Sequence, residues 1–325
     1  MAELPQRLTD QEFWRLSHRL SEPGGTFHSE NYISNESRYQ TVIPELISRV
    51  APGGLYVGVG PEQNFTYIAA IQARMAFIVD IRRGNLLEHL LYKALMERSA
   101  DRADFLARLF SRPRPAGLSA SSSAAELFAA YQAVPADLRM FRRTLADVMM
   151  GLTKEHGFAL TREDVTNIET IFRVGFFSDG PDLMYRRTDG VNAGRRPTYA
   201  ELMTIDDGSG RQKSYLAAEA SFAFLKDLQR RNMVIPVVGD FGGPVALRGV
   251  GEFVRRAGAT VNVFYLSNVE TYLRRDGKWQ TFCANVASMP LDESSTFIRS
   301  QSLGGMGGFV SSLGSMSADT RACRQ

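Results

Sequence analysis

The apolar positions of the chain alternate between compact runs and helical spacings. Compact runs at 55–57, 75–79, 233–239 and 260–266 predict buried strands. Between these runs, apolar residues recur at intervals of three and four positions, which is typical of helices with one buried face. Strands that alternate with helices indicate an α/β protein built on a mostly parallel sheet.

A long stretch after the second run lacks strands and predicts helices. We interpret 99–197 as a helical insertion that covers one side of a ligand cleft, with a Pro- and Ser-rich interruption at 113–123. We expect a delayed third strand at 201–205, a last edge strand at 296–300, and a flexible Gly-, Ser- and Met-rich tail at 304–325. Helical spacing within the insertion falls at 101–111, 124–132, 136–151 and 161–173.

The predicted organisation has five regions along the 325 residues. This length suits one large α/β domain with an insertion. The regions are N-terminal helices and a cleft loop at 1–54, a first βαβ unit at 55–98, the helical insertion at 99–197, the remainder of the α/β domain at 198–303, and the tail at 304–325.

The first βαβ unit carries the strongest functional signal. Its sequence, LYVGVGPEQNFTYIAAIQARMAFIVDIRR, reads as strand, glycine turn at Gly58 and Gly60, helix, second strand and terminal acid, Asp80. Glycines accept positive φ at such a turn, and the following helix presents unpaired N–H groups to a ligand. Asp80 lies near the roughly 20-residue spacing of a ribose-binding acid. The pattern favours nucleotide binding over a turn that binds nothing.

This stretch resembles motifs I and II of the class I S-adenosylmethionine-dependent methyltransferases. The resemblance implies an α/β fold with a Rossmann-like, methyltransferase-type sheet flanked by helices, and S-adenosylmethionine as cofactor. It implies that Gly58 and Gly60 form the cofactor turn, that Asp80 binds the ribose hydroxyls, and that Ile81 lies under the adenine. The segments NYISNE and YLSNVE also resemble uncharacterised bacterial proteins of this fold, which supply no activity.

The chain departs from that family at two positions. Glu62 stands where a third glycine is common, and Tyr56 where the first strand often carries an acid. Glu62 either stabilises the start of the helix or meets a cationic group, such as the amino group of a methionine moiety. An NADP-dependent oxidoreductase is a further alternative, because Arg82 and Arg83 follow the ribose acid and could contact a 2′-phosphate.

Other polar residues are predicted to border the cleft. Asp240 follows the 233–239 strand and is our candidate catalytic residue, although a turn aspartate is an equal alternative. Tyr32, Asn35 and Glu36 belong to a polar loop before the first strand, in a segment that often closes over the cofactor in this fold class. Asn268 follows the 260–266 strand and joins this candidate substrate or cofactor loop, with turn stabilisation as its alternative.

Composition narrows the function classes. The net charge of +3 and the scattered basic residues indicate no nucleic-acid partner, and no apolar run approaches the length of a membrane span. The four histidines lack metal-ligand spacing, so we expect no metal. Two cysteines and the lack of a signal peptide suggest the cytoplasm. We expect a methyltransferase acting on a small molecule or peptide, with a non-catalytic nucleotide-binding or regulatory protein as the alternative.

Overall fold

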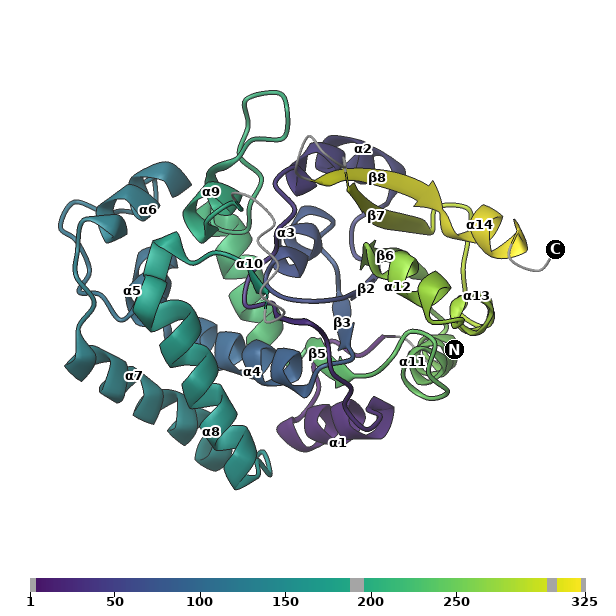
Figure 1. Ribbon diagram of the computed structural model, residues 1–325, viewed down its shortest axis with the longest axis horizontal. Coiled ribbons are helices and arrows are strands. Elements are labelled where there is room, and N and C mark those ends of the chain that lie inside the picture. Colours follow the sequence, from purple (N-terminus) through teal and green to yellow (C-terminus); the bar gives the residue numbers. More distant parts are fainter. Residues whose placement is uncertain (1–3, 188–195, 303–308, 323–325) are drawn as a thin grey trace.

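A mostly parallel six-stranded sheet forms the centre of the computed structural model, which describes residues 4–187, 196–302 and 309–322 (Figure 1). The strand order is β5-β3-β2-β6-β7-β8, and only the β7–β8 pair of this sheet is antiparallel. The predicted α/β class is therefore confirmed. The strands are β2 (Leu55–Gly58), β3 (Met75–Asp80), β5 (Val234–Val238), β6 (Val261–Ser267), β7 (Thr296–Ser302) and β8 (Phe309–Ser315).

The four predicted apolar runs form the four adjacent strands β5, β3, β2 and β6. Strands β2, β3 and β5 are buried along their whole length, as expected for parallel strands covered on both faces. The strand order reverses at β2, which pairs with β3 on one side and with the later β6 on the other. The chain turns to one face of the sheet after β2 and to the other face after β6. A crevice is therefore expected between these two strands, outside their carboxyl ends.

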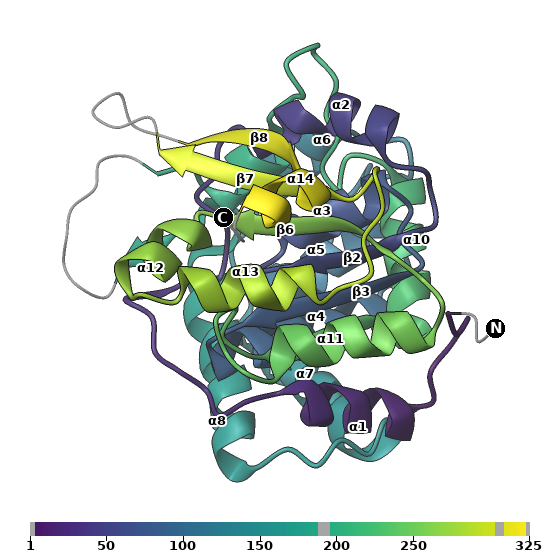
Figure 2. The same ribbon diagram turned by 90° about the vertical axis from the view of Figure 1, so that its right-hand side faces the viewer.

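Helices cover both faces of the sheet (Figure 2). Helix α4 packs against β3 and β5 on one face, whereas α1 contacts β5, α11 contacts β3 and α12 contacts β6 on the other. The first face carries α3 (Gln63–Ala70), α4 (Arg83–Arg98) and α10 (Glu219–Arg230). The second carries α1 (Asp10–Leu20), α11 (Ala246–Arg256), α12 (Val269–Arg275) and α13 (Trp279–Ala287).

The predicted helical region packs outside α4, at the left of Figure 1. Buried Arg102 ties it to the sheet domain, because its guanidinium pairs with Glu219 of α10 at 3.0 Å and donates to three backbone carbonyls. Its helices are α5 (Arg102–Phe110), α6 (Ala124–Gln132), α7 (Leu138–Met150), η2 (Gly151–Glu155), α8 (Arg162–Thr170), η3 (Ile171–Phe177) and η4 (Gly180–Asp182). Elsewhere lie η1 (Tyr39–Val42) and α2 (Ile43–Arg49).

The strand predicted at 201–205 is wrong. These residues belong mostly to helix α9 (Tyr199–Thr204). Thr198 caps the helix by accepting from the backbone N–H of Glu201, and the Glu201 side chain accepts from the backbone N–H of Thr198. This capping box is a helix-start signal that outweighs the short apolar run. The third strand of the sheet is β5 instead.

The C-terminal prediction is also wrong for the residues that the structure describes. The strand predicted at 296–300 exists as β7 but is not at the edge, because β8 pairs with it over the seven residues of each strand. Helix α14 (Met316–Ala322) follows, and Met316 is fully buried. This hairpin was not predicted from the sequence, because a Gly- and Ser-rich composition is typical of flexible segments. Residues 304–308 and 323–325 of the expected tail lie outside the described residues.

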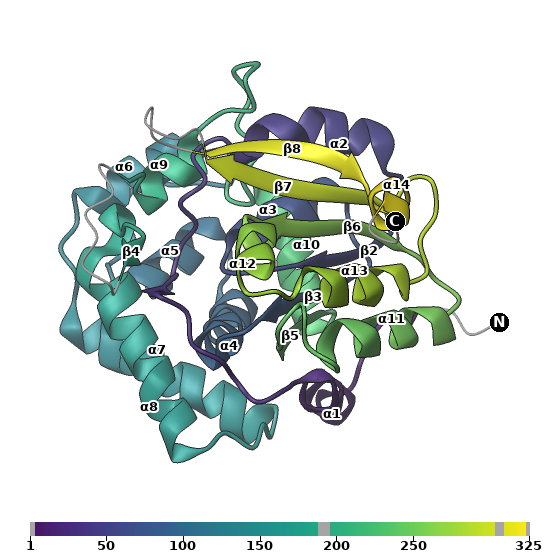
Figure 3. The same cartoon turned by 45° about the vertical axis from the view of Figure 1, so that its right-hand side comes forward.

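The segment between α1 and α2 crosses the carboxyl ends of the strands (Figure 3). The backbone N–H of Glu22 donates to the Val238 carbonyl of β5 at 2.8 Å, and that of Gly25 donates to the Ile81 carbonyl beyond β3, also at 2.8 Å. Residues 29–30 then form β1 (Ser29–Glu30), which pairs with β4 (Arg186–Arg187). We call residues 21–37 the N-terminal strap.

None of the described helices combines the length and apolarity that crossing a bilayer requires. Cys283, which is buried on α13, is not a free thiol.

The C-terminal helix offers a test of the hairpin. Met316→Ala should lower the free energy of unfolding by about 2–5 kcal/mol, the usual effect of emptying a buried Met site. Met150→Ala, at a side chain that is 54% exposed, is the matched control and should change it by less than about 0.5 kcal/mol. Urea denaturation of both variants measures the difference. Equal, small effects would show that the C-terminal segment is loosely held.

Candidate functional site

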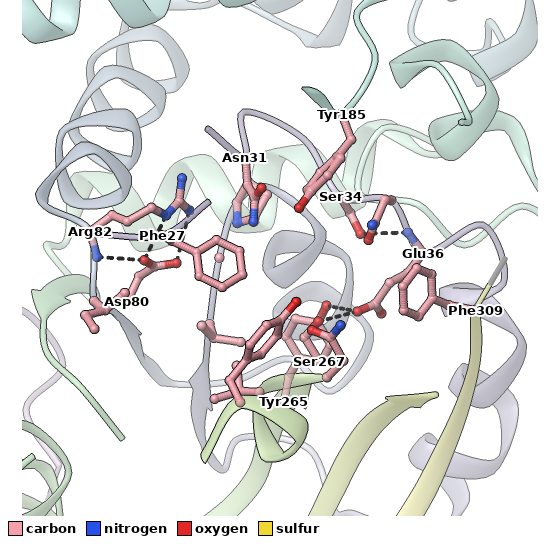
Figure 4. Close-up of a pocket in the computed structure, with 18 of the residues that line it drawn as sticks. Phe27, Asn31, Ser34, Glu36, Asp80, Arg82, Tyr185, Tyr265, Ser267 and Phe309 are labelled. Carbon is pink, nitrogen blue, oxygen red and sulfur yellow. Dashed lines mark hydrogen bonds and ion pairs between the residues drawn. The ribbon is translucent and has the colours of Figure 1, made fainter. Parts of the chain in front are cut away.

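A cavity of about 1360 Å³ opens at the carboxyl ends of the central strands (Figure 4). The ends of four neighbouring strands contribute residues to its wall. These include Gly60 after β2, Asp80 of β3, Asp240 after β5 and Ser267 of β6. The N-terminal strap supplies much of the opposite wall. The cavity therefore lies where ligands bind in open α/β sheets.

The glycine turn after β2 is held in one shape by a single amide. The side-chain NH2 of Asn64 donates to the carbonyls of Val59, Gly60 and Pro61 at 2.9, 3.1 and 2.7 Å. A ring nitrogen of His89 lies 2.9 Å from the Gly60 carbonyl oxygen. Gly60 has φ +78°, and a Cβ placed on it would meet no atom within 4 Å. This residue therefore lets the turn face the cavity without a side chain in the way.

Gly58 has a different role from the one expected. It is not among the cavity-wall residues, and a Cβ on it would lie 1.9 Å from the Asn64 Oδ1 atom. That oxygen accepts a hydrogen bond from the Tyr56 hydroxyl at 2.8 Å. Gly58 thus makes room for the amide that shapes the turn, and Tyr56, at the position where related motifs carry an acid, orients this amide.

Asp80 lies on the cavity wall, but its carboxylate is already engaged. Oδ1 accepts from the backbone N–H and the Nε of Arg82 at 2.8 and 3.1 Å, and Oδ2 accepts from Nη2 at 3.1 Å. A carboxylate has about four acceptor positions, so one remains for a ligand hydroxyl. Ile81 follows on the wall, and its place under an adenine stays a prediction.

The two arginines after Asp80 do not form an open phosphate site. Arg82 is buried against Asp80 and also lies 3.8 Å from Glu30. Arg83 makes a bidentate pair with Asp164, at 2.6 and 2.7 Å. Each guanidinium thus has a carboxylate partner within the chain.

Asp240 lies at the cavity wall with both oxygens occupied. Oδ1 accepts from the backbone N–H of Gly242 at 2.8 Å, which closes a turn, and Oδ2 pairs with the Lys278 ammonium at 2.5 Å. This geometry matches the alternative of a turn aspartate. Asn268 is on the wall too, directly before α12.

Glu36 is the most elaborately bound acid of the strap. It is 1% exposed, and its Oε1 accepts from the Tyr265 hydroxyl at 2.9 Å and from the Ser267 hydroxyl at 2.5 Å (Figure 4). Its Oε2 accepts from the side-chain NH2 of Gln63 at 2.9 Å. The Ser34 hydroxyl donates to the oxygen of the same Gln63 amide. The three partners of the carboxylate come from the start of α3 and the end of β6, and Ser34 comes from the strap.

The other two residues of the predicted loop lie in different places. Asn35 lies on the cavity wall beside Glu36, whereas Tyr32 is not among the wall residues and packs against Gly175 of η3. The sequence interpretation missed Tyr265 and Ser267. Their position at the end of a predicted strand was the signal, since side chains at the carboxyl ends of parallel strands face the ligand crevice.

Glu62 is buried behind the wall and does not face the cavity as a ligand group would. Its Oε1 receives the Ser34 backbone N–H at a long 3.4 Å, and its Oε2 has no hydrogen-bond partner among the described residues. Burial raises the pKa of Glu62 to about 8, which the Ser34 N–H only partly opposes. Burial also raises the pKa of the neighbouring Glu88 well above its usual value. A protonated Glu62 carries no charge with which to bind an ammonium group.

The helical region covers less of the cavity than expected. Within its described part, only the end of the predicted 99–197 insertion reaches the wall, through Tyr185, Arg196 and Pro197. Helix α9 adds Glu201 and Leu202. The exposed Pro- and Ser-rich stretch is absent from the wall, so the geometry gives it no lid role. No cluster of His, Cys, Asp and Glu among the described residues is placed to hold a metal ion.

A family described as "Domain of unknown function (DUF7790)" matches residues 32–314. The chain belongs to the DUF7790 family. The match runs from the strap through β8, so it spans every strand end that forms the cavity. A search of the curated proteins found no match.

The buried Glu62 of this DUF7790 protein predicts a pH-dependent stability difference. Because its folded pKa of about 8 exceeds the unfolded value near 4.5, the folded state keeps a proton that the unfolded state has lost. Stability should therefore fall between about pH 4.5 and 8 relative to Glu62→Gln, which cannot ionise. Urea denaturation of both proteins at pH 5, 6.5 and 8 measures this; Glu88 is present in both. A difference independent of pH would contradict the assignment.

Proposed function

We propose that this protein binds S-adenosylmethionine and transfers its methyl group to a small-molecule or peptide acceptor. The observation that carries the proposal is that the Gly60 turn and the Asp80 carboxylate border one cavity at the carboxyl ends of adjacent strands. In the methyltransferases that this stretch resembles, these two elements hold the methionine and ribose parts of the cofactor.

The topology favours a single nucleoside over a dinucleotide. The order β5-β3-β2-β6-β7 follows the Rossmann-like arrangement, with the switch point between β2 and β6. A dinucleotide-binding fold repeats a βαβαβ half on both sides of that point, whereas this sheet ends in the antiparallel β7–β8 pair. A methyltransferase-type sheet fits this arrangement. The carboxylate partners of Arg82 and Arg83 further disfavour an NADP phosphate site.

The cavity offers room for two molecules. Pockets for one small molecule usually enclose about 300–1,000 Å³, and this cavity encloses about 1360 Å³. We place the adenosine along the ends of β3 and β5, where Asp80 and Ile81 lie. The acceptor then lies toward β6 and the strap, near Glu36 and Ser267.

Positioning would supply most of the catalysis. Methyl transfer needs a nucleophile aligned with an electrophilic carbon, and holding both reactants in one cavity removes much of the entropic barrier. Asp240 stays our candidate for proton removal from an acceptor. If it acts so, Asp240→Asn should lower turnover on the order of 10²-fold while leaving cofactor affinity nearly unchanged.

A non-catalytic nucleotide-binding protein is the second candidate. The ion pair of Asp240 with Lys278 favours it, because the ammonium competes with a substrate proton for that carboxylate. Such a protein would bind the nucleoside with the same turn and acid and would show no turnover.

A thermal-shift panel with S-adenosylmethionine, S-adenosylhomocysteine, NAD and NADP tests the proposed ligand. A ligand at 100 times its Kd adds about 2.7 kcal/mol of stability, which raises the melting temperature measurably. We expect stabilisation by the first two compounds alone. Stabilisation by NADP but by neither sulfur nucleoside would replace the methyltransferase with an oxidoreductase.

Asp80→Asn should weaken S-adenosylhomocysteine binding by about 1.5–3 kcal/mol, the range for a hydrogen bond to a charged group. The amide keeps the size of the side chain but loses the charge and one acceptor. Asp227→Asn, at an exposed pair with Arg231 on α10, is the control and should bind as the wild type does. Calorimetry measures both. Unchanged affinity in folded Asp80→Asn would remove Asp80 from the ligand site.

A further inference from the structure

The acids of the cavity wall differ in their counter-charges. Glu201 belongs to the cap of α9. Glu36 has no cationic side-chain partner among the described residues, although it is almost fully buried. The wall acids that do pair with a cation are Asp80 with Arg82, Asp240 with Lys278, and Asp276 with Arg275.

Neutral donors alone hold the Glu36 carboxylate. Tyr265 and Ser267 donate through hydroxyls and Gln63 through an amide, so three of about four acceptor positions are filled. Removing a carboxylate from water costs several kcal/mol, and hydrogen bonds to neutral groups offset only part of that cost. A cation in the cavity would gain a short, charge-assisted hydrogen bond at the remaining position.

The surroundings also suit a cation. Figure 4 shows the rings of Tyr265 and Phe309 beside Glu36, with Tyr185 pointing into the same space. Aromatic faces attract ammonium groups within about 6 Å of the ring centre. The nearby guanidinium of Arg196 is stacked over the Tyr185 ring, at 4.6 Å from its centre. It thus has a ring partner of its own.

We propose that Glu36 binds an ammonium group of the ligand, so that the molecule at the β6 end of the cavity is an alkylamine. The identity of this amine rests on the proposed function. It is the α-ammonium of the cofactor's methionine moiety or the amine of the acceptor. Both are primary ammonium groups of similar size, and Glu36 provides the same charge to each.

Matched probes separate the two sources by calorimetry. S-Adenosylhomocysteine carries the α-ammonium, and 5′-methylthioadenosine is its counterpart without the amino acid. 1,5-Diaminopentane represents an acceptor amine, with 1,5-pentanediol as its uncharged counterpart, each measured with and without saturating S-adenosylhomocysteine. Wild type, Glu36→Gln and Glu45→Gln are compared. Glu45 is an exposed acid of α2 that pairs with Arg49, so Glu45→Gln should bind every probe as the wild type does.

We expect Glu36→Gln to lose about tenfold or more in affinity for one ammonium probe while keeping its affinity for 5′-methylthioadenosine and the diol. A loss confined to S-adenosylhomocysteine assigns the cofactor's ammonium, and a loss confined to the diamine assigns the acceptor. Wild-type affinity of Glu36→Gln for both ammonium probes would overturn the inference. An equal loss for 5′-methylthioadenosine, or no preference of the wild type for either ammonium probe, would do so as well.

Two further measurements keep the outcome decisive. If Glu36→Gln does not fold, Ser267→Ala removes one neutral donor and leaves the carboxylate less compensated, so it should bind the ammonium probe more tightly. Unchanged or weaker binding would then overturn the inference. If neither nucleoside binds the wild type, the methyltransferase proposal fails. Diamine binding that depends on Glu36 would still support the ammonium site.

Discussion

Backbone hydrogen bonds between the N-terminal strap and the strand ends hold the cavity together. Parallel strands end with carbonyl groups that need donors, and the strap supplies them from Glu22 to Val238 and from Gly25 to Ile81. The Glu22 carboxylate also accepts from the backbone N–H groups of Val245 and Ala246 at the start of α11. The strap is thereby fixed to three separate elements, which sets where its polar residues lie opposite the sheet.

The same constraint explains why the wall acids differ in environment. Asp80 and Asp240 lie at strand ends where an arginine and a lysine reach them. Glu36 is brought in by the strap and meets hydroxyls of β6 instead. Ser267 adopts φ +52°, an uncommon conformation for a residue other than glycine, at the point where β6 ends. This backbone turn coincides with the hydroxyl that contacts Glu36, so the strand end is shaped around the carboxylate.

The sequence predicted the four adjacent parallel strands β5, β3, β2 and β6 well, because each is a short, continuous apolar run. The spacing from Gly58 to Asp80 located one edge of the cavity. The sequence led to wrong predictions where its local signals were weak or mixed. The run at 201–205 looked like a strand although Thr198 and Glu201 form a helix cap. The contacts of Glu36 could not be predicted, because Tyr265 lies 229 positions away and only the folded sheet brings the two together.

The placement of β8 has a consequence for biosynthesis. The cavity wall includes strap residues from position 26 onward and also Phe309 of β8. A chain still being translated can form β2 and β3 early, but it lacks one side of the binding site until Phe309 has left the ribosome. Any ligand of this cavity would therefore have no complete site on nascent chains and would stabilise only molecules whose C-terminal hairpin has docked. Degradation of unfinished or truncated chains would accordingly proceed without protection by such a ligand.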